Sequence, residues 1–124
     1  MAKNILIIDD EELIVKSLKK LLEKEGYGVL IAKSGQDALI ITEEEKFDLI
    51  IADIRMPGLN GVDTIKSIRE NAAGNNAKET PVIFITGYAD EEMEKTAKTL
   101  KPLAYIYKPF NISDLVSVVN KELK

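Results

Sequence analysis

Apolar and polar residues follow one another along the chain in two kinds of block. Short runs are apolar throughout, and a longer stretch follows each of them in which apolar residues recur every three or four positions. The short runs, rich in Ile and Val, predict buried strands, and the longer stretches predict amphipathic helices. The expected strands are 5–8, 29–32, 49–52, 82–85 and 103–107.

Each longer stretch begins at residues suited to start a helix. The first helix is expected over residues 11–24. Its buried face should be formed by Ile14, Leu18, Leu21 and Leu22. The other four helices follow Ser, Asn or Asp residues, whose side chains cap helix N-termini. These residues are Ser34, Asn60, Asp90 and Asn111. The polar segment 71–80, with its Gly and Asn residues, predicts a loop.

The expected strands are apolar at nearly every position, which indicates a sheet covered by helices on both faces. Right-handed crossovers between such strands give an α/β fold with a doubly wound, five-stranded parallel sheet, a (βα)5 three-layer sandwich. A length of 124 residues fits one domain over residues 1–124. The apolar run 5–8 is too short for a signal-peptide core or a membrane span, so we expect a cytoplasmic protein without membrane contact.

The residues that the chain lacks narrow its chemistry. It has no Cys and no His, which excludes disulfides, Cys/His zinc sites, Ser-His-Asp triads and thiol nucleophiles. A metal ion would have to be held by oxygen atoms, which favours a hard cation such as Mg²⁺. The net charge is −4, and no run of Lys or Arg offsets it, which argues against direct binding of nucleic acid.

Polar residues stand where four of the expected strands end. Asp9 and Asp10 follow the first strand, and Asp53 follows the third. Thr86 ends the fourth strand, and Lys108 follows the fifth. Because parallel strands end at one edge of the sheet, these five side chains are expected to converge there. Three close carboxylates repel one another unless a cation joins them, so the sequence predicts a Mg²⁺ site.

A carboxylate beside Mg²⁺ is a candidate nucleophile toward phosphorus. Lys108 would offset charge on the phosphoryl group, and the Thr86 hydroxyl could donate a hydrogen bond to it. The product would be an aspartyl phosphate on Asp53. Taken singly, each residue has a simpler interpretation, such as a solvated strand end or an acid near a helix N-terminus. Their joint occurrence at one edge favours the phosphoryl site.

The chain resembles a response-regulator receiver domain, the CheY-like, flavodoxin-like fold of two-component signal transduction, over essentially its whole length. Four motifs in this order carry the resemblance: IIDDEE, IIADIRMPGLNG, FITGYA and YIYKPF. The resemblance implies that Asp53 is the phosphoacceptor and that Lys108 and Thr86 assist its chemistry. It also implies that Mg²⁺ is bound by Asp10, Asp53 and the backbone carbonyl of Arg55, with Asp9 acting mainly through a metal-bound water.

The same resemblance implies a switch. Thr86 and Tyr105 would move together on phosphorylation and change the surface of the fourth helix, fifth strand and fifth helix. The bond between Lys108 and Pro109 is expected to be cis, an isomer that proline makes accessible. Arg55 and Tyr88 stand two residues after Asp53 and Thr86, where they could screen the phosphoryl group from water. Lys101-Pro102 departs from the Gly-Ala often found after the fourth helix in the family.

Similar domains accept phosphate from a phosphohistidine and later hydrolyse it. The resemblance therefore implies a signalling switch rather than an enzyme with turnover. Its partners would be a sensor histidine kinase or a histidine phosphotransfer protein, and then a downstream effector or a C-terminal output domain. A homodimer that forms on phosphorylation is a further option. Three alternatives stay open: a receiver-like module that is never phosphorylated, a flavodoxin-like cofactor binder, and a phosphatase or dehalogenase with an Asp nucleophile.

Overall fold

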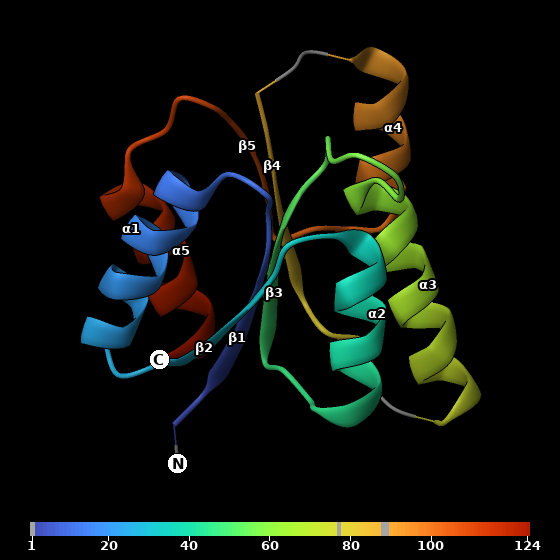
Figure 1. Cartoon of the computed structure of the whole chain (residues 1–124), viewed down its shortest axis with the longest axis horizontal. Coiled ribbons are helices and arrows are strands. Elements are labelled where there is room, and N and C mark those ends of the chain that lie inside the picture. The colour runs from blue at the N-terminus through green and yellow to red at the C-terminus, as the bar shows by residue number, and fades with distance from the viewer. Residues whose placement is uncertain (1, 77, 88–89) are drawn as a thin grey trace.

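The computed structural model describes residues 2–76, 78–87 and 90–124. Strands and helices alternate from one end to the other (Figure 1). The strands are β1 (Asn4–Ile8), β2 (Gly28–Ala32), β3 (Leu49–Asp53), β4 (Val82–Thr86) and β5 (Ala104–Tyr107). The helices are α1 (Glu12–Lys24), α2 (Gly35–Glu44), α3 (Gly61–Gly74), α4 (Glu91–Thr99) and α5 (Ile112–Leu123).

The strands form one parallel sheet in the order β2-β1-β3-β4-β5. Helices α1 and α5 cover one face, and α2, α3 and α4 cover the other (Figure 1). The doubly wound (βα)5 sandwich expected from the sequence is therefore confirmed. From β1 the chain adds β2 on one side and then β3, β4 and β5 on the other, so the direction of winding reverses between β1 and β3. Ligands of such sheets bind at this point, and here the carboxyl ends of the two strands carry Asp9 and Asp53.

Two apolar cores explain why the strands are apolar at successive positions. Alternate residues of β1, β3 and β4 point to opposite faces. One set packs under α1 and α5, where Val15, Leu18 and Leu22 are buried. The other set, which includes Phe84, packs under α2, α3 and α4. The central strands thus have no solvent-facing side, and apart from Asn4 at the start of β1 their polar residues lie at their carboxyl ends.

The expected N-caps form as hydrogen bonds. The side-chain oxygens of Ser34, Asn60 and Asp90 each accept from the backbone N–H three residues later, at 2.9 to 3.1 Å. Asn111 accepts from the N–H of Ser113 at 3.0 Å. These bonds satisfy N–H groups that have no partner inside the helix. The four helix starts were therefore predicted correctly.

Some sequence expectations were wrong in detail. Helix α3 continues to Gly74, four residues into the expected loop 71–80. Its last turn contains Ala72 and Ala73, which favour helix, and the Asn75 side chain donates to the carbonyl of Asn71 at 3.0 Å. On α1, Val15 is buried, whereas Leu21 is 38% exposed, because the buried stripe passes through Val15, Leu18 and Leu22.

The segment after α4 makes its turn without glycine. Lys101 adopts φ 53°, the left-handed conformation that glycine usually takes at the end of a helix. The following strand still pairs in register, with Tyr105 opposite Phe84. The departure at Lys101-Pro102 therefore leaves the position of Tyr105 in β5 intact.

Candidate functional site

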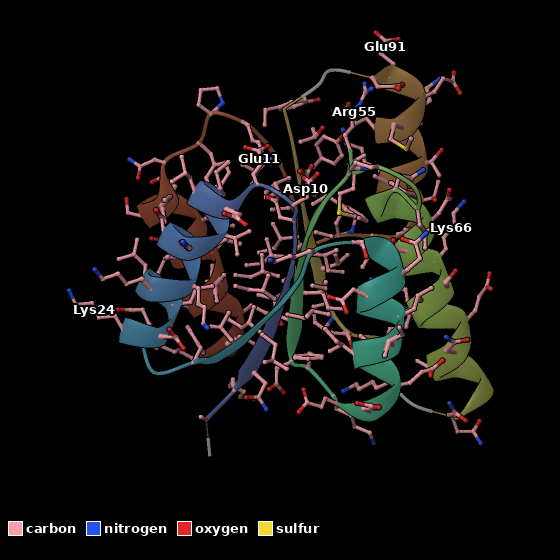
Figure 2. All side chains as sticks on the ribbon, in the orientation of Figure 1. Asp10, Glu11, Lys24, Arg55, Lys66 and Glu91 are labelled. Carbon is pink, nitrogen blue, oxygen red and sulfur yellow. The ribbon has the colours of Figure 1, made fainter. Side chains whose placement is uncertain are left out.

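The polar residues that end the strands gather at the carboxyl edge of the sheet. Asp9 and Asp10 follow β1, Asp53 ends β3, and Thr86 ends β4. Lys108 follows β5 and is joined to Pro109 by a cis peptide bond, as expected. Figure 2 shows Asp10, Glu11 and Arg55 together at this end of the molecule, far from Lys24.

The three carboxylates form one cluster. One oxygen from each of Asp9, Asp10 and Asp53 lies within 4.8 Å of the other two. Asp9 and Asp53 are buried, and Asp10 is exposed at the mouth of the cluster. Backbone N–H groups orient the buried pair: Glu11 donates to Asp9 Oδ1 at 3.0 Å, and Arg55 donates to Asp53 Oδ1 at 3.2 Å. The remaining oxygens of the buried pair are left for other partners.

Lys108 lies across the buried acids. Its Nζ atom is 3.0 Å from Asp53 Oδ2 and 3.6 Å from Asp9 Oδ2, and it also contacts Glu11. Burial lowers the pKa of this ammonium group, but its hydrogen bonds to Glu11 and Asp53 outweigh that effect, so the net pKa is raised. Lys108 therefore remains a cation directly beside the carboxylate of Asp53.

One buried oxygen is left short of partners. Asp9 Oδ2 has no hydrogen-bond partner among the described residues, and the Lys108 ammonium lies beyond hydrogen-bond distance from it. The pKa of Asp9 is raised from its ordinary 3.8 to about 6, first by burial and then by the charge of Asp53; the bond from Glu11 and the charge of Lys108 oppose this. A buried carboxylate oxygen without a donor fits a cation, and oxygen ligands suit Mg²⁺.

Gly61 allows α3 to begin directly against the site. A Cβ atom at this position would lie 2.2 Å from the backbone oxygen of Asp53. The Gly61 N–H instead donates to the carbonyl of Ile54 at 2.9 Å. This close approach fixes the loop that follows Asp53, including the backbone of Arg55, whose N–H orients the Asp53 carboxylate.

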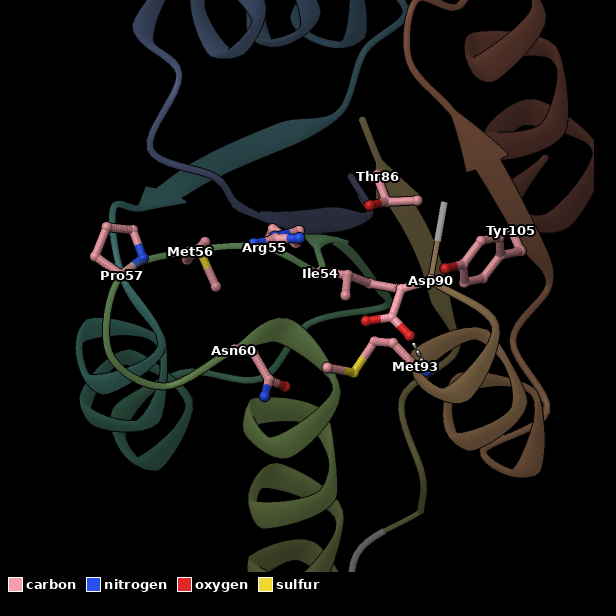
Figure 3. A pocket seen from close by; sticks show the side chains of 9 residues that line it. All are labelled: Ile54, Arg55, Met56, Pro57, Asn60, Thr86, Asp90, Met93 and Tyr105. Carbon is pink, nitrogen blue, oxygen red and sulfur yellow. Dashed lines mark hydrogen bonds between the residues drawn. The ribbon is translucent and has the colours of Figure 1, made fainter. Parts of the chain in front are cut away.

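A cavity of about 510 Å³ opens beside the acids, between the loop after β3 and the N-terminus of α4 (Figure 3). Thr86 lines it on the side of the site, and Tyr105 lines it from β5. Burial, followed by the charges of Glu94 and Asp90, raises the pKa of Tyr105, so its hydroxyl stays protonated. Thr86 and Tyr105 thus line the same cavity, which is where a coupled movement of the two residues would take place.

Sequence reasoning missed one residue of the site. Glu11 contacts Lys108, although its side chain is 53% exposed. It is the third acid in the run from Asp9 to Glu12, and that run of charge was the only signal. Tyr88, expected to screen the phosphoryl group together with Arg55, lies outside the described residues. Arg55 itself is exposed and lines the cavity.

The geometry agrees with comparisons to known proteins. The model of the response regulator receiver domain matches residues 5–120. The chain is 35% identical to the transcriptional regulatory protein CpxR of Escherichia coli (strain K12), over 97% of this chain and 49% of CpxR. It is 34% identical to sporulation initiation phosphotransferase F of Bacillus subtilis (strain 168), over 99% of this chain and 95% of that protein. The chain spans about half the length of several of its relatives.

Solved structures give the same result. A CheY-like response regulator receiver domain protein from Methanospirillum hungatei JF-1 superposes with a TM-score of 0.89 at 34% identity, covering 99% of this chain and 94% of that one. A response regulator from Burkholderia pseudomallei, solved with a phosphorylated aspartic acid, a calcium ion and citrate, gives 0.79 at 28% identity, covering 94% and 65%. The chain therefore belongs to the response regulator receiver family of two-component signal transduction.

Proposed function

We propose that this domain accepts a phosphoryl group on Asp53 in a Mg²⁺-dependent reaction and that the modified domain signals through α4, β5 and α5. The observation that carries the proposal is the buried acid pair at the edge of the sheet. Asp53 presents one carboxylate oxygen to Lys108, and beside it no residue that the structure describes donates a hydrogen bond to Asp9 Oδ2. Buried, clustered carboxylates destabilise the fold, so their presence is better explained by a role in binding a cation and a phosphoryl group than by a structural role.

In the proposed reaction, an Asp53 carboxylate oxygen forms a bond to phosphorus while the bond from phosphorus to the donor nitrogen breaks. The donor is a phosphohistidine, and its imidazole leaves as the neutral group after taking up a proton. Asp10, Asp53 and the Arg55 carbonyl would hold Mg²⁺, with Asp9 acting mainly through a metal-bound water. The bound ion would offset the charge of the phosphoryl oxygens.

The protein's own residues position the group. The Arg55 N–H holds one oxygen of Asp53, which leaves the other to react. Lys108 is close enough to move from the carboxylate to a phosphoryl oxygen, where its charge would stabilise the transition state. Thr86 would donate its hydroxyl to another phosphoryl oxygen. This chemistry modifies the domain itself, so we regard the protein as a switch and not as an enzyme with turnover.

The added charge is the signal. A phosphoryl group brings about −1.5 to −2 charges and three acceptor oxygens to this edge. Thr86 would move toward them, and Tyr105 would move into the cavity that both line. The equilibrium between two packings of α4, β5 and α5 would thereby shift. This surface would engage a downstream effector, an output domain or a second copy of the domain.

The expected phosphodonors are a sensor histidine kinase or a histidine phosphotransfer protein. We also propose a cytoplasmic location for the protein. No helix in the described part of the chain is long and apolar enough to cross a membrane.

Phosphorylation by a small phosphodonor tests the proposal. We expect intact-mass spectrometry to show one phosphoryl adduct on the protein in the presence of Mg²⁺ and none with a chelator. Asp53→Asn should remove the adduct while the circular dichroism spectrum stays unchanged. Asp114→Asn, which changes an exposed acid on α5, serves as the matched control and should be labelled normally. A full adduct on Asp53→Asn would refute the assignment.

A further inference from the structure

Arg69 connects three parts of the chain at the far end of α4. It belongs to α3, which lies beside α4 (Figure 1). Its side chain is only 12% exposed. Nη1 donates to the carbonyl of Leu100, where α4 ends, and Nη2 donates to the carbonyl of Thr80 at 3.4 Å. Nε lies 3.9 Å from Glu79 Oε2.

Helix α4 has few other attachments to the body of the protein. Ala97 is its only buried residue, and Met93 and Leu100 are partly buried. The Glu94 side chain accepts a hydrogen bond from the Tyr107 hydroxyl of β5. At its N-terminus, Asp90 and Met93 line the cavity that Thr86 also lines (Figure 3). One end of α4 thus borders the phosphoryl site, and the other end is held by Arg69.

The contact with Leu100 fits the chemistry of a helix end. The last carbonyls of a helix have no intrahelical partners and carry partial negative charge, so a guanidinium donor suits them well. The next residue, Lys101, adopts the left-handed backbone conformation, which is unfavourable for any residue with a side chain. The end of α4 therefore has an unfavourable backbone conformation and a cation that fixes its carbonyl. The Glu79 side chain is 71% exposed, so its ion pair adds little.

We propose that Arg69 is a latch that holds α4 in its unphosphorylated position. Arg69 acts through α4 and touches neither Asp53 nor the phosphoryl group, so it is a positioning residue. Its removal weakens the resting arrangement and raises the population of the arrangement that accepts phosphate. This inference rests on the proposed function, because it concerns the switch that phosphorylation of Asp53 sets.

Two measurements test the latch. The first is hydrogen exchange of residues 95–101 in the unphosphorylated protein without donor or metal, which does not depend on the proposed function. Loss of a hydrogen bond to a charged donor should speed exchange there about tenfold in Arg69→Ala. The second is the initial rate of Asp53 phosphorylation by a small phosphodonor with Mg²⁺. This rate should rise about five- to tenfold if the competent population rises in proportion.

The chain offers a matched control and a conservative variant. Lys66→Ala removes a positive charge one turn earlier on α3 and should leave both measurements unchanged. Arg69→Lys keeps the charge but loses the two-pronged guanidinium, so both effects should be smaller than in Arg69→Ala. It also serves as the test if Arg69→Ala does not fold.

The outcomes separate the two proposals. If the wild-type protein takes up no phosphoryl group at Asp53, the proposed function fails, and the exchange experiment still reports on the latch. If the wild type is phosphorylated and Arg69→Ala matches Lys66→Ala in exchange and in rate, the latch is wrong. Lower thermal stability of Arg69→Ala with an unchanged or slower phosphorylation rate would show a purely structural role and would also overturn it.

Discussion

The same strands form both the apolar interior of the sheet, here called its body, and the charged carboxyl edge. Along β1 and β3 a buried aliphatic residue is followed directly by a buried carboxylate. Ile8 is 0% exposed and Asp9 1%; Ala52 is 0% exposed and Asp53 3%. Burial of the aliphatic side chains stabilises the fold. Burial of the carboxylates at the same depth costs free energy, which Lys108 offsets only in part. The body of the sheet thus stabilises the fold, whereas the buried carboxylates at the edge lower its stability and supply the groups of the candidate site.

The largest effect on stability should come from the body. Leu18→Ala removes a fully buried side chain of α1 and should lower the free energy of unfolding by about 3 kcal/mol, measured by urea denaturation. Leu21→Ala, on the same helix but 38% exposed, should cost far less. Both variants should still be phosphorylated at normal yield. Two outcomes would contradict the separation of stability in the body from chemistry at the edge. One is an equal loss of unfolding free energy in the two variants, and the other is loss of phosphorylation in a folded Leu18→Ala protein.

A smaller effect should appear at the edge when pH changes. The folded-state pKa of Asp9, about 6, lies above its ordinary value of 3.8, so the folded protein binds this proton more tightly than the unfolded chain does. The metal-free protein should therefore gain stability as pH falls from about 7 to about 4, and lose it as pH rises through 6. The gain should be on the order of 2 to 3 kcal/mol.

The pH effect has a direct control. Asn at position 9 cannot titrate, so Asp9→Asn should lack this pH dependence. The difference in free energy of unfolding between the wild type and Asp9→Asn should therefore change with pH by the full amount, on the order of 2 to 3 kcal/mol. Saturating Mg²⁺ should suppress the effect in the wild type, because the ion competes with the proton. If the free energy of unfolding of the two metal-free proteins varied with pH in the same way, the raised pKa of Asp9 in the folded state would be contradicted.

The smallest stability effect should follow from loss of one exposed charge. Asp10→Ala relieves repulsion in the acidic cluster and should raise the metal-free melting temperature by about 3–5 °C, seen by calorimetry. The same change should weaken Mg²⁺ binding at least about tenfold, since it removes an expected ligand. Glu12→Ala changes a nearby acid on α1 and should do neither. A lower metal-free melting temperature in Asp10→Ala would count against a repulsive cluster.

Sequence patterning predicted the sheet and the residues at its edge for one physical reason. Strands buried on both faces must be apolar until they end, so polar residues mark their ends, and parallel strands end together. This reasoning alone predicts that Asp9, Asp53, Thr86 and Lys108 lie at one edge of the sheet.

Other features depend on spatial contacts that local sequence does not encode. The contact between Arg69 and Leu100 joins residues 31 positions apart and depends on the packing of α3 against α4. The contact between Glu11 and Lys108 depends on where two long, flexible side chains point. The end of α3 was misjudged because Asn and Gly suggested a loop, whereas the alanines between them continue the helix.

The most direct measurement locates the phosphoryl group within the chain. Borohydride reduction converts an aspartyl phosphate into homoserine, and peptide mass spectrometry then identifies the altered residue. After treatment with a small phosphodonor and Mg²⁺, we predict a single altered residue, Asp53, and no alteration when a chelator replaces the metal. Alteration at another acid, or an equal yield at Asp53 without Mg²⁺, would contradict a metal-dependent phosphoryl site at the edge of this sheet.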